Sequence, residues 1–168
     1  LALGWLTWDL THSPLWLGII GFSATFVTAV IAPLAGTVAD RFGLRKTAFI
    51  ALSCSSANTM AIAIITINGA MKVELLVILT LVQGITLSFD LPARQALVHH
   101  IVDREDLSAA IALNTTTFHV GAFIGPALFG VVTSIWDIPA AFFINSLSFF
   151  ALSTILLVSS KALVSLFS

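Results

Sequence analysis

GTVADRFGLRK, residues 36–46, concentrates ionised side chains in a chain that otherwise has very few. Four of its last seven residues are charged, namely Asp40, Arg41, Arg45 and Lys46. Only 9% of the 168 residues are Asp, Glu, Lys or Arg, and uncharged runs at 10–39 and 47–71 reach the charged residues from either side. Because a charge at the centre of a bilayer costs about 2.5–3.5 kcal/mol, this pattern predicts a tight connection between two membrane-spanning segments.

The composition of the whole chain indicates a protein whose main solvent is lipid. Its residues are 58% hydrophobic, its mean hydropathy is +1.07, and a soluble domain would carry about 25% charged residues. A helix needs about 20 apolar residues to cross the hydrocarbon core, and a lone strand cannot cross because its backbone groups would stay unpaired. The sequence therefore predicts an all-α integral membrane protein with spans at about 1–9, 14–39, 47–68, 72–91, 106–135 and 138–160.

Basic residues are distributed unevenly between the two predicted membrane faces. The connections on one face hold six of them: Arg41, Arg45, Lys46, Arg94, Arg104 and Lys161. The connections on the other face hold Lys72 alone. The same opposite face has the tryptophans Trp5, Trp8, Trp16 and Trp136, as an aromatic belt would. The excess of Lys and Arg on cytoplasmic loops predicts that the loop 40–46 is cytoplasmic.

Several classes of function are disfavoured by the residues present. The net charge of −1, with no basic stripe, argues against nucleic acid as a partner. Cys54 is the only cysteine, so a disulfide framework is not expected. A polar cluster has no recognisable metal-ligand spacing and is interpreted as a solvated helix end: His99, His100, Asp103, Glu105 and Asp106. No nucleophile with a neighbouring base lies at membrane depth, so neither an enzyme with a catalytic residue nor a metal site is expected.

The charged loop is open to two interpretations. Any basic loop would anchor the topology. Asp40, however, is an acid at the expected end of a helix, where the macrodipole disfavours it unless a partner compensates. Gly36 would let a neighbouring helix approach closely, and Gly43 would permit a sharp reversal. These features favour a latch between helices over a simple anchor.

Three stretches resemble the major facilitator superfamily. The pattern Gly36-x-x-x-Asp40-Arg41-x-Gly43-x-Arg45-Lys46 resembles the signature loop between its second and third helices. GAFIGPALFG, residues 121–130, resembles the antiporter motif of its exporters through Gly121, Gly125, Pro126 and Gly130. The segment 89–114 is similar to the connection between the fourth and fifth helices in the enterobactin-exporter-like and multidrug-exporter-like branch.

The resemblance implies the N-terminal six-helix half of a secondary transporter that works by alternating access, with its first helix truncated. A missing C-terminal half of the same chain would follow a cytoplasmic linker that starts at 161–168. In such proteins the loop charges latch onto the fourth helix, where Asp90 and Arg94 are the expected partners. The implied activity is proton-driven export of a hydrophobic or amphiphilic small molecule, of drug or siderophore type, across a bacterial inner membrane. An uptake symporter, a lysophospholipid flippase and a non-transporting remnant stay open as alternatives.

Polar residues at membrane depth are candidates for contact with a substrate or a proton: Gln83, Asn114, His119 and Asn145. His119 lies about 21 Å along its helix from Glu105, at 1.5 Å per residue, and therefore near the midplane. A buried histidine there could carry a proton, so the proton gradient and not a cofactor would supply the energy. Alternatively, His119 is neutral and hydrogen-bonded to Asn114, Thr115 or a neighbouring helix. Thr80 stands where many proton-coupled relatives have an arginine.

Overall fold

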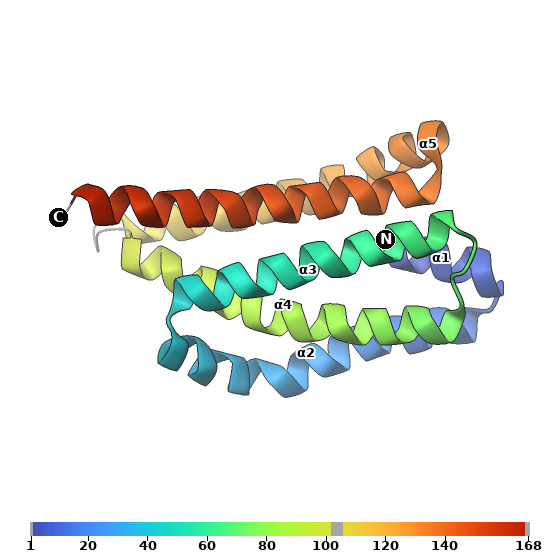
Figure 1. Cartoon of the computed structure of the whole chain (residues 1–168), viewed down its shortest axis with the longest axis horizontal. Helices are drawn as coiled ribbons and strands as arrows, with labels where there is room; N and C mark the ends of the chain where they lie inside the picture. Colours follow the sequence, from blue (N-terminus) through green and yellow to red (C-terminus); the bar gives the residue numbers. More distant parts are fainter. Residues whose placement is uncertain (1, 102–105, 167–168) are drawn as a thin grey trace.

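The computed structural model describes residues 2–101 and 106–166, and this part of the chain folds into five helices (Figure 1). They are α1 (Ala2–Thr11), α2 (Pro14–Phe42), α3 (Leu44–Ile67), α4 (Val73–Ile101) and α5 (Leu107–Leu166). By length and composition, four of the described helices could cross a membrane: α2, α3, α4 and α5. The all-α membrane architecture predicted from the sequence is therefore present, although the helix count differs from six.

Residues with special backbone preferences set the helix ends. α2 begins at Pro14, whose fixed φ suits the first helical position, after Ser13 in an extended conformation. It ends at Gly43, whose φ of 93° is available to few other residues. α3 ends at Asn68 and Gly69, where Gly69 has a φ of 65° and its N–H donates to Thr66 O at 3.0 Å. Gly43 alone connects α2 to α3, so the charged residues predicted in a loop lie in the ends of two helices.

α4 is longer than expected. The sequence predicts that this span ends near residue 91, but α4 runs through Pro92 to Ile101. Beyond the proline, Ala93 and Leu97 are buried against Ala39 of α2 and Ala48 of α3. Continuing the helix buries this apolar surface, which offsets the hydrogen bond that proline removes.

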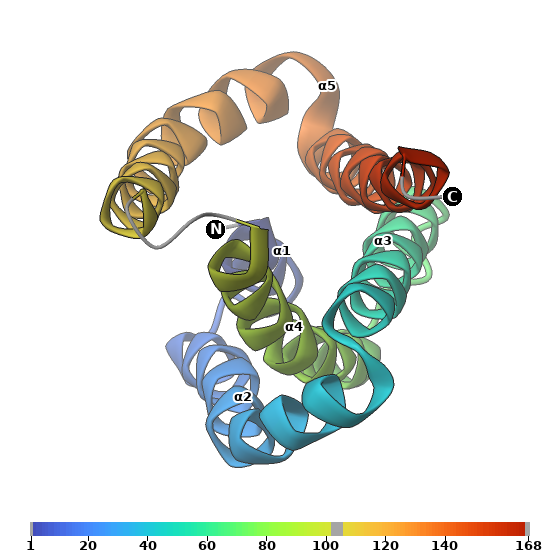
Figure 2. The same ribbon diagram turned by 90° about the vertical axis from the view of Figure 1, so that its left-hand side faces the viewer.

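The spans expected at 106–135 and 138–160 form one helix, α5, broken at a single residue. Asp137 has a φ of 69° and a ψ of 172°, outside the helical region. The chain reverses there, so that a first arm, 107–136, and a second arm, 138–166, run in opposite directions (Figures 1 and 2). The second arm continues through 161–166, where the start of a linker was predicted.

The helices pack into a bundle with α4 against both α2 and α3, and with the second arm of α5 against α3. One apolar core joins α1, α2, α3, α4 and α5: Leu6, Ile20, Ile62, Ala63, Met71, Leu76 and Phe142. Ser56 and Ser146 fasten the second arm to α3, because each hydroxyl donates to the carbonyl of the other residue, at 3.0 and 2.9 Å. Both serines are buried.

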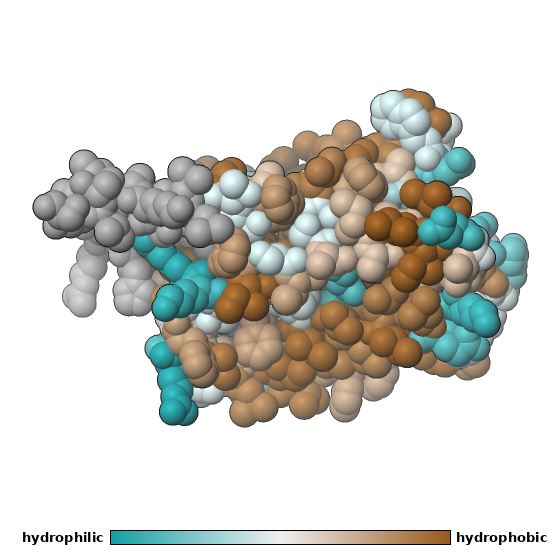
Figure 3. All heavy atoms as spheres, in the orientation of Figure 1, coloured by the Kyte–Doolittle hydropathy of each residue, from teal (hydrophilic) through white to brown (hydrophobic). Residues whose placement is uncertain are grey.

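The first arm of α5 packs little against the other helices and stands apart from the α2–α3–α4 bundle (Figure 2). Its large apolar side chains are exposed, with Leu113 at 70%, Phe118 at 69% and Phe123 at 85%. Figure 3 shows hydrophobic residues over the middle of the visible face and hydrophilic residues mainly toward its two ends. This distribution suits a bundle whose middle lies in lipid.

Candidate functional site

The charged stretch lies at one end of the bundle, where α2 turns into α3 and the last turns of α4 approach (Figure 1). Asp40, Arg41 and Lys46 are exposed there, and Arg45 is half-buried. Arg41 suits the negative end of the α2 dipole, whereas Asp40 opposes it. Within residues 2–101 and 106–166, Asp40 forms no hydrogen bond and no ion pair.

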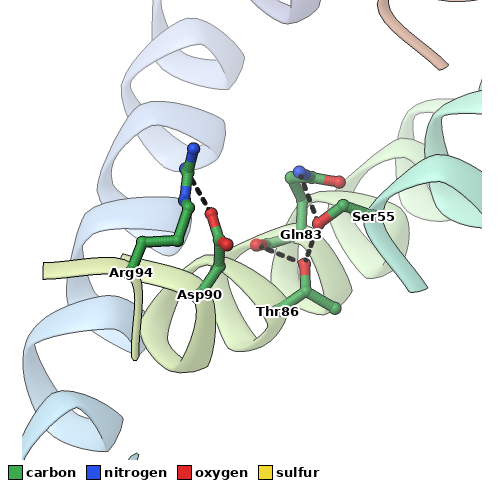
Figure 4. Close-up of polar contacts among 5 residues, drawn as sticks. All are labelled: Ser55, Gln83, Thr86, Asp90 and Arg94. Atoms are coloured by element: carbon green, nitrogen blue, oxygen red, sulfur yellow. Dashed lines mark hydrogen bonds and ion pairs between the residues drawn. The ribbon is translucent and has the colours of Figure 1, made fainter. Parts of the chain in front are cut away.

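α4 contributes the ion pair of this end. Asp90 is 2% exposed, and its Oδ2 accepts a hydrogen bond from Nη2 of Arg94, one helical turn further along (Figure 4). The side chain of Arg94 is 42% exposed, so the guanidinium connects a buried carboxylate to the outside of the bundle. Oδ1 of Asp90 and Nε of Arg94 are buried without a partner among the described residues. The pair is therefore only half satisfied.

Small side chains bring this pair close to the charged helix junction. Asp90, Ala93 and Leu97 are three and four residues apart, so they share one face of α4. Ala93 and Leu97 pack directly against Ala39 and Ala48, which flank Gly43. The structure thus places the predicted residues of stretches 36–46 and 90–94 at the same end. It pairs Arg94 with Asp90 and leaves Asp40 apart from both.

A polar cluster that the sequence did not predict joins α3 to α4, and we call it the α3–α4 clamp: Ser55, Asn58, Gln83 and Thr86. Asn58 Nδ2 donates to Gln83 Oε1 at 2.9 Å and to Leu79 O at 3.0 Å. Ser55 Oγ donates to Thr86 Oγ1 at 3.0 Å and accepts from Gln83 Nε2 at 3.5 Å (Figure 4). Gln83, a candidate for substrate or proton contact, is thus engaged in holding two helices together.

The other candidates at membrane depth lie far along the chain, on α5. Asn114, His119 and Asn145 are exposed. The ring of His119 stands edge-on to Phe118 at 5.9 Å between centroids. In the described chain His119 makes no hydrogen bond to Asn114 or Thr115. Among the described residues, the side-chain hydrogen bonds of Gln83 go to Asn58 and Ser55 and not to any of these three.

The glycines of the antiporter-like stretch face open space. A Cβ built on Gly121, Gly125 or Gly130 would meet nothing within 4 Å, and the same holds for Gly36. Pro126 lies inside α5, between the first two of these glycines and the third. The close helix approach occurs instead at Gly84 of α4, where a Cβ would lie 3.0 Å from Ala24 O of α2.

Part of the predicted polar segment falls outside the described residues. These are Asp103, Arg104 and Glu105, together with the side chains of His99 and His100. Within the described part of the chain, no group of three or more His, Cys, Asp or Glu could hold a metal ion. Thr80 is buried, and its hydroxyl donates to Leu76 O at 2.8 Å.

The α3–α4 clamp leads to a first testable prediction. Asn58→Ala removes both hydrogen bonds of the Asn58 amide, so we expect the folded bundle to lose about 0.6–1.7 kcal/mol. Asn114→Ala is the matched control, because Asn114 is exposed and lies outside the clamp. The check is the apparent melting temperature of the two purified variants in one detergent. Equal melting temperatures for Asn58→Ala and Asn114→Ala would contradict the clamp.

Comparison with known proteins shows which family the chain resembles. Residues 1–165 match the family of the major facilitator superfamily described as transmembrane secretion effector. The chain is 23% identical over 151 residues to the Staphyloferrin A transporter of Staphylococcus aureus, an alignment that covers 89% of this chain and 38% of that protein. It is 33% identical over 131 residues to the putative multidrug resistance protein MdtD of Klebsiella pneumoniae strain 342, covering 78% of this chain and 27% of that protein.

The chain thus spans about a third of the length of the relatives it matches. No solved structure matches it. The family match covers almost every residue, and the fold is a bundle of helices long and apolar enough to cross a membrane. Both observations lead to the same conclusion: the chain belongs to the transmembrane secretion effector family of the major facilitator superfamily, a family of transporters.

Proposed function

We propose that this chain is the N-terminal half of a proton-driven exporter of hydrophobic or amphiphilic small molecules in a bacterial inner membrane. The relatives named above, a staphyloferrin A transporter and a putative multidrug resistance protein, support a substrate of siderophore or drug type. The observation that carries the proposal is the half-satisfied Asp90–Arg94 pair beside the charged α2–α3 junction.

The pair suits a switch because it has an unused acceptor. Asp90 Oδ1 is buried without a donor, and a buried polar atom in this state costs about 1–3 kcal/mol. A donor that reaches Oδ1 in one conformation only would stabilise that conformation by a similar amount. Movement of the α2–α3 junction relative to α4, or approach of the second half of the transporter, would supply or remove such a donor.

In this proposal the α2–α3 junction faces the cytoplasm. Arg41, Arg45, Lys46 and Arg94 lie at that end, whereas Lys72 lies between α3 and α4 at the other. Tryptophans on α1, near the start of α2 and beside the break in α5 belong to the Lys72 end. Both distributions follow the pattern of inner-membrane proteins. His119, on the exposed first arm of α5, is then the candidate proton carrier nearest the midplane.

Replacing Asp40, near the end of α2, by a neutral residue distinguishes a latch from an anchor. Asp40→Asn keeps the size of the side chain, so insertion into the membrane should stay normal. Export should fall several-fold, because in the proposed latch Asp40 pairs with a basic partner when the junction moves relative to α4 or the second half approaches, and the amide has no charge for that pairing. The check is ethidium accumulation in a bacterial host that expresses the whole gene containing this chain, with membrane levels measured by immunoblot. Lys72→Gln, at the other end, is the control. Normal export by Asp40→Asn would contradict the latch and would show that the junction serves only as a topology anchor.

A further inference from the structure

A groove runs along the side of the bundle between α2, α3 and α4. Its volume is about 470 Å³, and α2 contributes Val38 and Phe42 to its wall, α3 contributes Ile50 and α4 contributes Ile85 and Phe89. These side chains are apolar, and Phe42 and Ile50 are 64% and 60% exposed. The groove therefore opens laterally, toward the surroundings of the bundle and not toward its core.

A second groove of about 460 Å³ adjoins the first at the α2–α3 junction. It is lined by Gly43, Leu44, Arg45 and Leu97, and it shares Phe42 and Lys46 with the first groove. Arg45 and Lys46 bring two positive charges to this part. The two grooves together are amphipathic, with a basic part at the end of the bundle and an apolar part along its side. Figure 3 shows the same change from hydrophilic to hydrophobic surface, with hydrophilic residues at the α2–α3 end beside the hydrophobic middle.

The apolar part offers almost nothing to a polar solute. Two threonine hydroxyls in its wall are already committed: Thr47 Oγ1 donates to Gly43 O at 3.1 Å, and Thr86 Oγ1 donates to Gln83 O at 2.9 Å. The ammonium of Lys46, at the mouth, is the one charged donor among the lining residues. Such a wall fits a hydrocarbon chain whose polar end lies near Lys46.

The length of the groove fits one leaflet. From Lys46 at the mouth to Cys54 in the wall, α3 rises about 12 Å at 1.5 Å per residue. One leaflet contributes about 15 Å of the roughly 30 Å hydrocarbon core. Basic side chains near a membrane surface attract anionic lipid, by about 1 kcal/mol each, and Asp40 is the single acid against Arg41, Arg45 and Lys46 at this junction.

We propose that this amphipathic groove binds one anionic phospholipid from the leaflet at the Gly43 end of the bundle. Its phosphate pairs with Lys46 and Arg45, and one acyl chain lies between α2, α3 and α4 as far as Cys54. The bound lipid lies beside the helix ends that pack together through Ala39, Ala48, Ala93 and Leu97. This site is separate from the Asp90–Arg94 pair, and it does not depend on which substrate is exported.

The first test is native mass spectrometry of the purified chain in detergent, with phosphatidylglycerol or phosphatidylcholine added in equal amounts. We expect one phosphatidylglycerol to be retained, several-fold more than phosphatidylcholine. Lys46→Gln should remove the preference, whereas Lys72→Gln, a matched exposed lysine at the other end, should keep it. Equal retention of both lipids, or an unchanged preference in Lys46→Gln, would overturn the proposal.

The second test locates the acyl chain through Cys54, the only cysteine of the chain, which is exposed on the groove. Phosphatidylglycerol should slow its alkylation by N-ethylmaleimide several-fold, and glycerol phosphate without acyl chains should not. Cys54→Trp, which fills the apolar part, should lower lipid retention, whereas Ile64→Trp on the same helix outside the groove should not. Retention of phosphatidylglycerol without protection of Cys54 would place the lipid elsewhere and overturn the proposal.

Discussion

Replacing Gly84 by leucine is expected to destabilise the bundle by about 2–3 kcal/mol, because the new side chain would have no room between α4 and α2. A Cβ at this position would lie 3.0 Å from Ala24 O and 3.3 Å from Val27 Cβ. The first of these atoms belongs to the backbone, so α2 itself would have to move. That movement would also break the hydrogen bond from Thr28 Oγ1 to Gly84 O, which measures 3.3 Å.

The measurement for Gly84→Leu is the apparent melting temperature in detergent together with the monodisperse fraction on size exclusion. Gly21→Leu is the matched control, because it makes the same change on α2 at a position where a Cβ meets nothing within 4 Å. We expect Gly21→Leu to resemble the wild type. Equal losses in both variants would show that the effect comes from helix glycines in general and not from the contact between α2 and α4.

Arg94→Met is expected to destabilise the bundle by about 1–3 kcal/mol, because it leaves the carboxylate of Asp90 buried without its cation. Asp90 is 2% exposed and already has one oxygen without a partner. Asp90→Asn should cost less, since the side chain of Arg94 is 42% exposed and retains access to the surroundings. The loss therefore depends on which member of the pair is removed.

A double variant separates the ion pair from simple packing. Asp90→Asn combined with Arg94→Met should recover much of the stability lost in Arg94→Met, because the buried charge is removed together with its partner. The check is a double-mutant cycle from thermal unfolding in one detergent. If Arg94→Met unfolds at the wild-type temperature, or if the double variant is less stable than both single variants, the buried-charge explanation fails.

The helix ends could largely be predicted from single residues. Pro14 begins α2 and Asn68 and Gly69 end α3, because proline and glycine restrict or extend backbone angles locally. Two boundaries were wrong for a tertiary reason. α4 continues past Pro92 because Ala93 and Leu97 find buried positions against other helices, and no local pattern reports such a contact. The connection predicted at 40–46 shrinks to Gly43 because both helices extend to it.

The site was predictable in its composition and not in its pairing. Because charged side chains avoid lipid, the sequence indicated that 36–46 and 90–94 would share one end, and the long uncharged runs beside them placed that end at a membrane face. The pairing of Asp90 with Arg94 depends on side-chain packing around α4. The α3–α4 clamp was missed although its signal was present, since Ser55 and Asn58 on α3, and Gln83 and Thr86 on α4, are each three residues apart and so share a face.

The glycines also show that composition could be predicted from the sequence while packing could not. The stretch 121–130 is rich in glycine and resembles a known motif, yet its glycines meet no neighbour in the described bundle. Gly84, an isolated glycine beside Gln83, is the one packed tightly against another helix. Sequence shows where a close approach is permitted, whereas only the arrangement of helices shows where it is used.

Proton movement in inverted membrane vesicles tests the proposed export most directly. Vesicles from cells expressing the whole gene would be energised to an acidic interior, reported by acridine orange, and then given ethidium, other amphiphilic cations or siderophores. Export by proton antiport predicts that at least one compound releases protons and restores the fluorescence, and that vesicles carrying Asp40→Asn respond several-fold less. No release with any of these compounds, from vesicles that contain the correctly inserted protein, would contradict the proposal.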